Sequence, residues 1–258
     1  MNKVVIIGAG SGDPELITLK GKRYLEQADI IVYTGSLLNP EYLKYAKSSA
    51  ELYDSAKMGL PEMLNVMVAG VKAGKSVVRL HDGDPSFFGA IQELMDGLDN
   101  EGVGYWRIPG ISCLLGAAAA LNRELTLPNI SQTIIITRPA GRTPVPEAES
   151  IVKLAQHQAT MVIFLGTPQI AKVMVDLAKG GYHKDTPVSV VYKATWPEQK
   201  IVLGTIADIA EKVKAQGITE TALIFVGKVM NPKAYDLSKL YDPTFTTGFR
   251  KGEDANVP

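Results

Sequence analysis

The chain has little cysteine, no excess of charge of either sign and no long apolar run. Cys113 is the single cysteine among 258 residues, so no disulfide can form within the chain, and we expect a cytoplasmic protein. No Cys/His cluster has the spacing of a zinc site, and we expect no metal site. The longest apolar stretch, residues 113–121, is far shorter than a membrane span, and the apolar run ending at Gly8 is too short for a signal sequence.

The charge balance excludes several classes of partner. Lysine plus arginine and aspartate plus glutamate both number 27, so the net charge is zero. Proteins that bind nucleic acids or membrane surfaces in general need an excess of cations, so we expect neither partner. A local basic pocket for an acidic small molecule remains possible, because a balanced total says nothing about one site.

Strand and helix patterns alternate along the chain and predict an α/β protein with two α/β domains. We expect an N-terminal domain over 1–121, a linker over 122–131, a C-terminal domain over 132–240 and a loose tail over 241–258. Short β-branched runs predict strands at 3–7, 30–33, 76–80, 103–108, 133–137, 160–165, 187–192, 200–203 and 221–226. Apolar residues at helical spacing predict helices at 15–28, 61–73, 87–99, 113–121, 147–157, 168–179 and 206–216.

A glycine loop follows the first predicted strand. Residues 4–21 read VVIIGAGSGDPELITLKG, a strand, a glycine turn and a helix, which is the arrangement of many phosphate-binding sites. The spacing is G-x-G-x-G, however, and no G-K-[ST] follows. Asp13 and Glu15 stand where a phosphate needs donors, so we favour a tight turn capped by Asp13 over a phosphate site. The floor of a cleft for an uncharged or cationic ligand is a third alternative.

Five motifs in order resemble one enzyme family. The first is the glycine loop, the second is GDPSFFG at 83–89 and the third is IPGISC at 108–113. Together they resemble the tetrapyrrole (corrin/porphyrin) methyltransferases that use S-adenosylmethionine, with Ser11 where proline is usual. The stretches TRPAGRTPVPE at 137–147 and VVYKATWPE at 190–198 resemble the branch that methylates precorrin-4 or cobalt-precorrin-4 at carbon 11 in cobalamin biosynthesis. The resemblance covers about residues 3–232.

The resemblance implies a homodimer of the tetrapyrrole methylase fold, with S-adenosyl-L-methionine in a cleft between the two domains. S-adenosylmethionine carries no phosphate, so the glycine loop would border the cleft for the macrocycle. Motif by motif, the resemblance assigns the cofactor contacts to Asp82, Gly83, Asp84, Ser112, Cys113, Phe164, Leu165, Lys193, Ala194 and Gly227.

The macrocycle carries acetate and propionate arms, which arginine binds well. We therefore expect substrate contacts from Arg138 and Arg142, and by resemblance from Ser11, Ser36 and His81. Each has a structural alternative: a solvated loop charge for the arginines, a helix cap for Ser36 and a hydrogen-bonded loop-end residue for His81. The catalytic residue stays unknown, because in-line methyl transfer needs positioning and exclusion of water rather than a strong nucleophile.

Three other functions compete with carbon-11 methylation. One is methylation of another ring carbon by a sister enzyme, and another is a non-enzymatic module that binds S-adenosylmethionine. The third is a nicotinamide-dependent dehydrogenase, which the first loop alone suggests; Tyr33-Thr34-Gly35 offers no acid for a ribose there. The sequence does not decide whether the tetrapyrrole substrate already carries cobalt.

Overall fold

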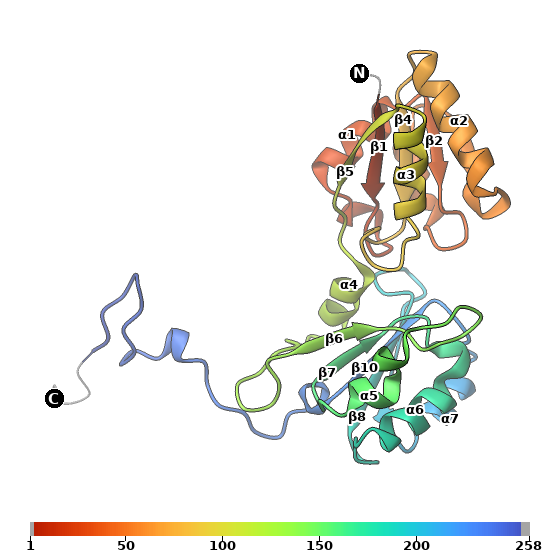
Figure 1. Ribbon diagram of the computed structural model, residues 1–258. Helices are drawn as coiled ribbons and strands as arrows, with labels where there is room; N and C mark the ends of the chain where they lie inside the picture. The colour runs from red at the N-terminus through yellow and green to blue at the C-terminus, as the bar shows by residue number, and fades with distance from the viewer. Residues whose placement is uncertain (1–2, 254–258) are drawn as a thin grey trace. The chain divides into compact units, whose positions relative to one another are not determined.

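The computed structural model describes residues 3–253, and their contacts divide the chain into two compact units (Figure 1). The first unit runs up to Leu121 and also includes Val191–Lys200. The second unit comprises Asn122–Val190 and the chain from Ile201 onward. The sequence pattern places residues 191–200 in the C-terminal domain, whereas their contacts group them with the first unit.

The first unit is built on a parallel five-stranded sheet with the order β3-β2-β4-β1-β5. Its strands are β1 (Lys3–Gly8), β2 (Ile30–Tyr33), β3 (Glu51–Asp54), β4 (Val77–His81) and β5 (Gly104–Ile108). Its α-helices are α1 (Leu19–Gln27), α2 (Leu60–Lys72), α3 (Gln92–Asn100) and α4 (Cys113–Ala120). Short 3-10 helices occupy Pro14–Leu16, Pro40–Tyr45 and Ser55–Lys57.

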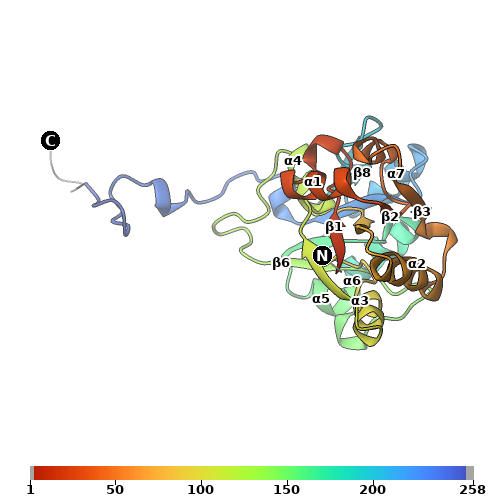
Figure 2. The same cartoon turned by 90° about the horizontal axis from the view of Figure 1, so that it is seen from above.

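Both faces of this sheet are buried, which explains why its strands are continuous apolar runs. Along β1, Val4 and Ile6 pack in one cluster with residues of α2 and α3, as they point to one face. Val5 and Ile7 point to the other face, where they pack with Leu25 of α1. Figure 2, which looks down on the first unit, shows α1 on one side of β1 and α2 and α3 on the other.

The second unit contains another five-stranded sheet, with the order β6-β7-β10-β8-β9. Its strands are β6 (Ile134–Thr137), β7 (Thr160–Ile163), β8 (Pro187–Tyr192), β9 (Lys200–Thr205) and β10 (Ala222–Val226). β6 runs parallel to β7, and β10 runs antiparallel to it. The helices are α5 (Ile151–Ala155), α6 (Ile170–Lys179) and α7 (Ile209–Ala215), with 3-10 turns at Glu147–Glu149, Thr167–Gln169, Lys228–Met230 and Lys239–Tyr241.

The α/β prediction is confirmed, and the predicted strands agree with the structure to within about two residues at most ends. β3 was not expected. The helix predicted over 15–28 is divided, because Thr18 caps a new helix with its hydroxyl on the Gly21 N–H. The helix predicted over 87–99 begins only at Gln92, because Phe88 and Ala90 have φ values of 53° and 45°, outside the helical region.

The segments outside the two sheets are short or exposed. The expected linker, 122–131, makes one turn closed by a bridge between Leu127 and Ser131. Of the expected tail, the structure describes residues 241–253, in which Tyr241 and Phe249 are largely exposed, and the last five residues lie outside the described range. Among the described helices, none has both the length and the apolar character needed to cross a membrane.

Candidate functional site

The carboxyl edge of the first sheet brings most of the predicted site residues together. All five strands are parallel, so the loops that follow β1, β2, β4 and β5 begin at the same edge, where α/β proteins bind their ligands. These loops carry Ser11, Ser36, Asp82–Asp84 and Ser112 in turn. Three of the five sequence motifs, and the loop that carries Ser36, therefore meet at one edge of the first unit (Figure 1).

The backbone N–H groups of Gly10, Gly12 and Asp13 in the glycine loop donate hydrogen bonds to other parts of the protein. Gly10 and Gly83 exchange both hydrogen bonds, with N–O distances of 3.2 and 2.9 Å. The Gly12 N–H donates to the Tyr42 hydroxyl at 3.3 Å, and the Asp13 N–H donates to Thr195 Oγ1 at 3.0 Å. Asp13 Oδ1 accepts from the Glu15 N–H at 2.9 Å. The predicted turn capped by Asp13 is confirmed, and the loop does not offer the free donors of a phosphate cradle.

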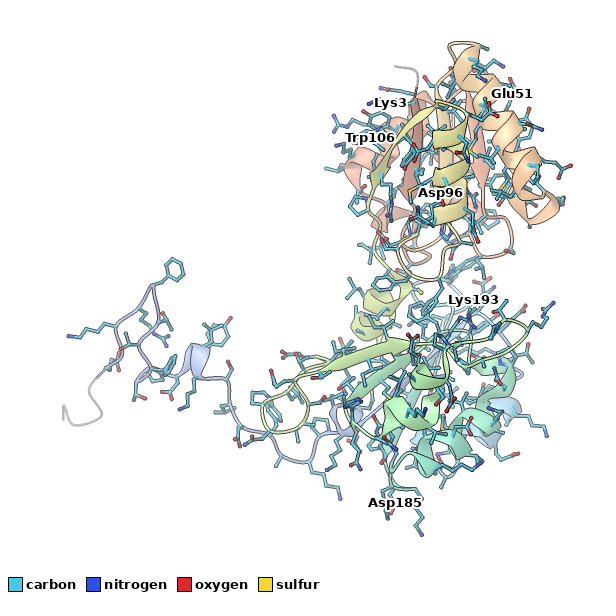
Figure 3. The ribbon with its side chains drawn as sticks, viewed as in Figure 1. Lys3, Glu51, Asp96, Trp106, Asp185 and Lys193 are labelled. Carbon is cyan, nitrogen blue, oxygen red and sulfur yellow. The ribbon has the colours of Figure 1, made fainter. Side chains whose placement is uncertain are left out.

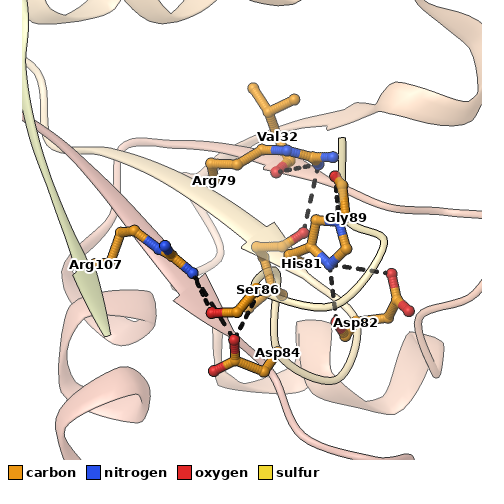
Figure 4. Close-up of polar contacts among 9 residues, drawn as sticks. Val32, Arg79, His81, Asp82, Asp84, Ser86, Gly89 and Arg107 are labelled. Atoms are coloured by element: carbon orange, nitrogen blue, oxygen red, sulfur yellow. Dashed lines mark hydrogen bonds and ion pairs between the residues drawn. The ribbon is translucent and has the colours of Figure 1, made fainter. Parts of the chain in front are cut away.

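Asp84 joins the second and third motifs. Its Oδ1 accepts from the Ser86 N–H at 2.8 Å (Figure 4), and its Oδ2 accepts from the Gly110 N–H at 2.9 Å. Arg107 Nη2 lies 3.8 Å from Oδ1. Burial opposes ionisation of this carboxyl, but the hydrogen bonds from Ser86 and Gly110 and the Arg107 charge together lower its pKa. Asp84 is therefore a charged clamp between two loops.

The close approach of these loops depends on glycine. A Cβ atom on Gly110 would lie 2.2 Å from the Gly83 carbonyl oxygen, and a Cβ on Gly8 would lie 2.6 Å from the Gly110 nitrogen. Any side chain at these positions would push the loops apart. The glycines of the three motifs thus serve backbone packing at the strand ends.

His81 holds the loop that contains the GDP motif. The ring is almost completely buried, with Nδ1 2.8 Å from the Asp82 carbonyl oxygen and Nε2 3.1 Å from the Gly89 carbonyl oxygen. Figure 4 shows the ring between these two ends of the loop. This arrangement agrees with the structural alternative for His81, and a substrate contact stays a prediction.

Arg79, two residues earlier on β4, is also buried. Its Nη1 donates to the carbonyl oxygens of Val32 and Leu80 at 3.2 and 3.4 Å. Burial lowers the pKa of its guanidinium to about 10, and the charge of Asp82 opposes that effect. A buried cation at the end of β4 was not among the predicted site residues, although an arginine inside an otherwise apolar strand is an observable signal.

Two buried side-chain oxygens in the described part of the chain lack a hydrogen-bond partner, Thr34 Oγ1 and Asp82 Oδ1. They follow β2 and β4, which are neighbours in the sheet. Asp82 Oδ1 lies 3.3 Å from His81 Nδ1, but that nitrogen is already directed at the Asp82 carbonyl oxygen. Buried acceptors are normally paired, so these two atoms mark places where a ligand can donate.

The third motif starts α4. Ser112 caps the helix by accepting from the Leu114 N–H at 3.3 Å. Burial raises the pKa of the Cys113 thiol to about 11, and the Asp82 charge adds to this effect. The thiol is therefore protonated at neutral pH, a state in which a cysteine is a poor nucleophile. Within residues 3–253 no three His, Cys, Asp or Glu side chains are grouped to hold a metal ion.

The segment 191–200 adds Lys193 and Ala194 to the first unit. Ala194 is buried. Lys193, labelled in Figure 3, has its Nζ 4.6 Å from the centre of the Trp196 ring and 4.0 Å from Glu198 Oε1. Trp196 in turn lies against Gly12, where a Cβ atom would come within 2.1 Å of its Cδ1. Thr195 contacts the glycine loop directly, yet the sequence reasoning did not select it, because a single threonine has no periodic signal.

The second unit holds the remaining predicted residues at the ends of three strands. β6 and β7 are parallel, so Arg138 and Phe164–Leu165 follow them at the same edge of the sheet. Phe164 is buried and its N–H donates to the Thr137 carbonyl oxygen, whereas Leu165 is 61% exposed with φ 54°. Gly227 follows β10, which is antiparallel to β7, and therefore lies near Thr160 at the opposite edge.

The two predicted arginines differ in their surroundings. Arg138 donates to the carbonyl oxygens of Pro139, Thr143 and Pro144 and so closes its own loop. Arg142 lies at the exposed tip of that loop, as does Ser36 in the loop after β2. The cofactor and substrate roles assigned to these residues stay predictions.

Comparison with known proteins gives the family. The model for the Tetrapyrrole (Corrin/Porphyrin) Methylases matches residues 3–210, which is most of the chain. The chain belongs to this family. This tetrapyrrole methylase is 58% identical, over 96% of each chain, to a protein of Methanocaldococcus jannaschii named cobalt-precorrin-4 C(11)-methyltransferase. A protein of the same name from Priestia megaterium is 47% identical over 97% of this chain and 98% of its own.

Solved structures agree with this tetrapyrrole methylase assignment. The X-ray structure of a cobalt-precorrin-4 methyltransferase, a cobalamin biosynthetic enzyme, has a TM-score of 0.87 and 45% identity, covering 90% of this chain and 97% of that one. The uroporphyrin-III C-methyltransferase of Thermus thermophilus complexed with S-adenosylhomocysteine has a TM-score of 0.74 and 26% identity, covering 91% and 96%. The predicted fold and family are therefore confirmed.

Proposed function

We propose that this tetrapyrrole methylase transfers a methyl group from S-adenosyl-L-methionine to carbon 11 of cobalt-precorrin-4 in cobalamin biosynthesis. The observation that carries the proposal is the 58% identity over 96% of both chains with a protein of that name. A protein of Pseudomonas aeruginosa that is named for metal-free precorrin-4 is 41% identical. The higher identities belong to relatives named for the cobalt complex, and this favours a substrate that already carries cobalt.

The residues at the carboxyl edge of the first sheet fit this donor. S-adenosylmethionine has ribose hydroxyls and an ammonium group, all of which donate hydrogen bonds. Asp82 Oδ1 is a buried acceptor that lacks a hydrogen-bond partner, and the neighbouring Gly83, with φ 54°, brings the backbone close to the start of α4, where a Cβ atom would lie 3.5 Å from the Cys113 nitrogen. We assign Asp82, Gly83, Asp84, Ser112 and Cys113 to binding of the donor, together with Lys193 and Ala194 from the segment 191–200.

Methyl transfer requires the protein to align the two reacting carbons and to keep water out of the site. The donor supplies an electrophilic methyl carbon, whose bond to sulfur breaks as the ring carbon forms its new bond. The protein must hold the two carbons in line and exclude water. A thiolate beside the donor would compete for the methyl group, and the raised pKa of Cys113, about 11, keeps that thiol protonated. The family motif therefore accepts a cysteine here at little risk of self-methylation.

The substrate side of the proposal rests on the carboxylate arms of the macrocycle. Arg142 is exposed at the tip of a proline-rich loop and keeps its guanidinium available for a bidentate carboxylate contact. Arg138 holds that loop in place through its bonds to the carbonyl oxygens of Thr143 and Pro144. We also assign Ser11, Ser36 and His81 to this side, and Phe164, Leu165 and Gly227 to the donor.

Resemblance to the family also leads us to propose a cytoplasmic homodimer. Light scattering on the purified chain tests the dimer directly. A monomer over the micromolar range would contradict it.

An anaerobic incubation tests the activity. The chain is mixed with methyl-labelled S-adenosylmethionine and, in parallel, cobalt-precorrin-4, metal-free precorrin-4 and a precorrin that already carries the carbon-11 methyl group. We expect label in the product of the first, less from the second and none from the third. Label in none, with S-adenosylmethionine still bound in calorimetry, supports the alternative of a non-enzymatic binding module.

A further inference from the structure

Thr195 has a backbone conformation that needs outside support. Its φ is 67°, and that of Lys193, two residues earlier, is 44°. A β-branched residue rarely adopts positive φ. Such strain persists only where the surrounding contacts hold it, and it is concentrated at functional sites. The contacts of Thr195 therefore indicate what this strain serves.

The Thr195 side chain is bonded to the glycine loop. Its Oγ1 lies 3.0 Å from Ser11 Oγ and accepts from the Asp13 N–H at 3.0 Å. The Thr195 N–H donates to Gln199 Oε1 at 2.8 Å, which fixes the segment itself. One hydroxyl therefore joins two positions of the loop to a segment that lies more than 180 residues further along the chain.

Helix α4 packs closely against the Ser11–Thr195 pair. A Cβ atom on Gly116 of α4 would lie 2.4 Å from Ser11 Oγ and 3.3 Å from Thr195 Cγ2. The far side of the loop is held separately, because Asn39 Nδ2 donates to the Gly12 carbonyl oxygen and the Tyr42 hydroxyl donates to that of Asp13, both at 2.8 Å. Loss of the Thr195 hydroxyl would thus release one side of the loop without unfolding it.

We propose that Thr195 is a positioning residue for the tetrapyrrole, which acts by fixing residues 11–13 of the glycine loop. The proposal rests on the proposed function, in which this loop borders the macrocycle. The GDP loop on the donor side has a second anchor, because Asp84 ties it to Gly110 in addition to the bonds between Gly10 and Gly83. Neither anchor uses the Thr195 hydroxyl, which is the group that the test removes. Thr195 should therefore govern binding of the acceptor and not of S-adenosylmethionine.

Hydrogen–deuterium exchange tests the structural half and needs no substrate. In Thr195→Val, which keeps the side-chain shape, exchange of the Asp13 amide should rise roughly tenfold, because its hydrogen bond is lost. Thr195→Ser should restore the wild-type rate. Thr205→Val removes a hydroxyl that bonds Asp208 in the second unit and serves as the matched control. Unchanged Asp13 exchange in Thr195→Val would overturn the proposal even if the chain proved to be no methyltransferase.

Kinetics on the same variants test the functional half. Thr195→Val should raise KM for cobalt-precorrin-4 roughly tenfold, with the Kd of S-adenosylhomocysteine within about twofold of wild type. Ser11→Ala should raise KM less, and Ser11→Ala with Thr195→Val should match Thr195→Val alone, because the two hydroxyls form one pair. An unchanged KM, or a weakened donor with an unchanged KM, would overturn the positioning role.

Discussion

Asp84 and Asp82 stand two residues apart, but the fold uses them differently. Asp84 accepts from two backbone N–H groups and ties the second motif to the third, so its charge contributes to stability. Asp82 keeps a buried oxygen without a partner, so that atom contributes little to stability and is available to a ligand. The same residue type in one short motif therefore has a structural role at Asp84 and the binding role that we propose at Asp82.

Asp84→Ala should lower the free energy of unfolding by about 1–3 kcal/mol at neutral pH, since it removes the charged acceptor of the Ser86 and Gly110 N–H groups. The folded-state pKa of Asp84 is below its ordinary value of 3.8, so the ionic part of its contribution is present above that value and is lost as the pH falls through the folded-state pKa. Urea unfolding at neutral and acid pH, with the exposed Asp96→Ala as control, should show the deficit shrinking in acid. A deficit that grew in acid would contradict this account.

Asp82→Asn should weaken binding of S-adenosylhomocysteine about tenfold, because a charged acceptor is lost from the donor site. Its stability in urea should change by less than that of Asp84→Ala, as Oδ1 accepts no hydrogen bond in the free protein and only lies 3.3 Å from His81 Nδ1. Titration calorimetry measures the affinity, and Asp96→Ala again serves as the control. Equal affinities would remove Asp82 from the site.

At the scale of elements, the glycine loop and the segment 191–200 form one packed structure. Gly12 has φ 149°, and a Cβ atom there would lie 2.1 Å from Trp196 Cδ1. Gly12→Ala should therefore destabilise the chain by about 1–3 kcal/mol, as overpacking does, and should also raise KM for the tetrapyrrole. Gly217→Ala is the control, because Gly217 has φ 67° but open space around its Cβ position. It therefore reports the cost of backbone strain without the clash with Trp196. Chemical denaturation of both variants checks the difference, and equal losses would count against the clash.

The elements that the sequence predicts well are those with a local cause. The strands of the first sheet are continuous apolar runs because both of their faces are buried, and any such run is visible in the sequence. β3 escaped prediction because it is a short edge strand with two exposed residues, Glu51 and Leu52, at its start. The start of α3 was misplaced because Phe88 and Ala90 adopt positive φ, which no propensity indicates.

The sequence motifs indicated which loops would meet, but they did not indicate which side chains would contact one another. The loops after four parallel strands begin at one edge of the sheet. The motifs in these loops were therefore sufficient to predict that Ser11, Asp82–Asp84 and Ser112 lie at the same edge. The hydroxyl of Thr195 and the buried Arg79 act through tertiary contacts, which the sequence does not contain. Gly227 lies at the opposite edge from Phe164 because β10 runs antiparallel to β7, and the sequence does not reveal the direction of a strand in its sheet.

At the scale of the whole molecule, a ligand that binds only the folded chain raises the melting temperature by mass action. S-adenosylhomocysteine at about 100 times its Kd should stabilise the chain by about 2.7 kcal/mol, whereas NAD at the same concentration should not. The NAD arm tests the dehydrogenase alternative, because the Gly12 and Asp13 N–H groups are already bonded to Tyr42 and Thr195 and do not point to a pyrophosphate. A thermal shift with NAD alone would reverse the assignment.

The central claim is that this fold presents one ring carbon of a cobalt corrin precursor to the methyl donor. The most direct test is carbon-13 NMR of the product formed anaerobically from cobalt-precorrin-4 and S-adenosylmethionine labelled at the methyl carbon. We expect a single enriched methyl signal, coupled to carbon 11 of the macrocycle. A labelled methyl group on any other ring carbon would contradict the account.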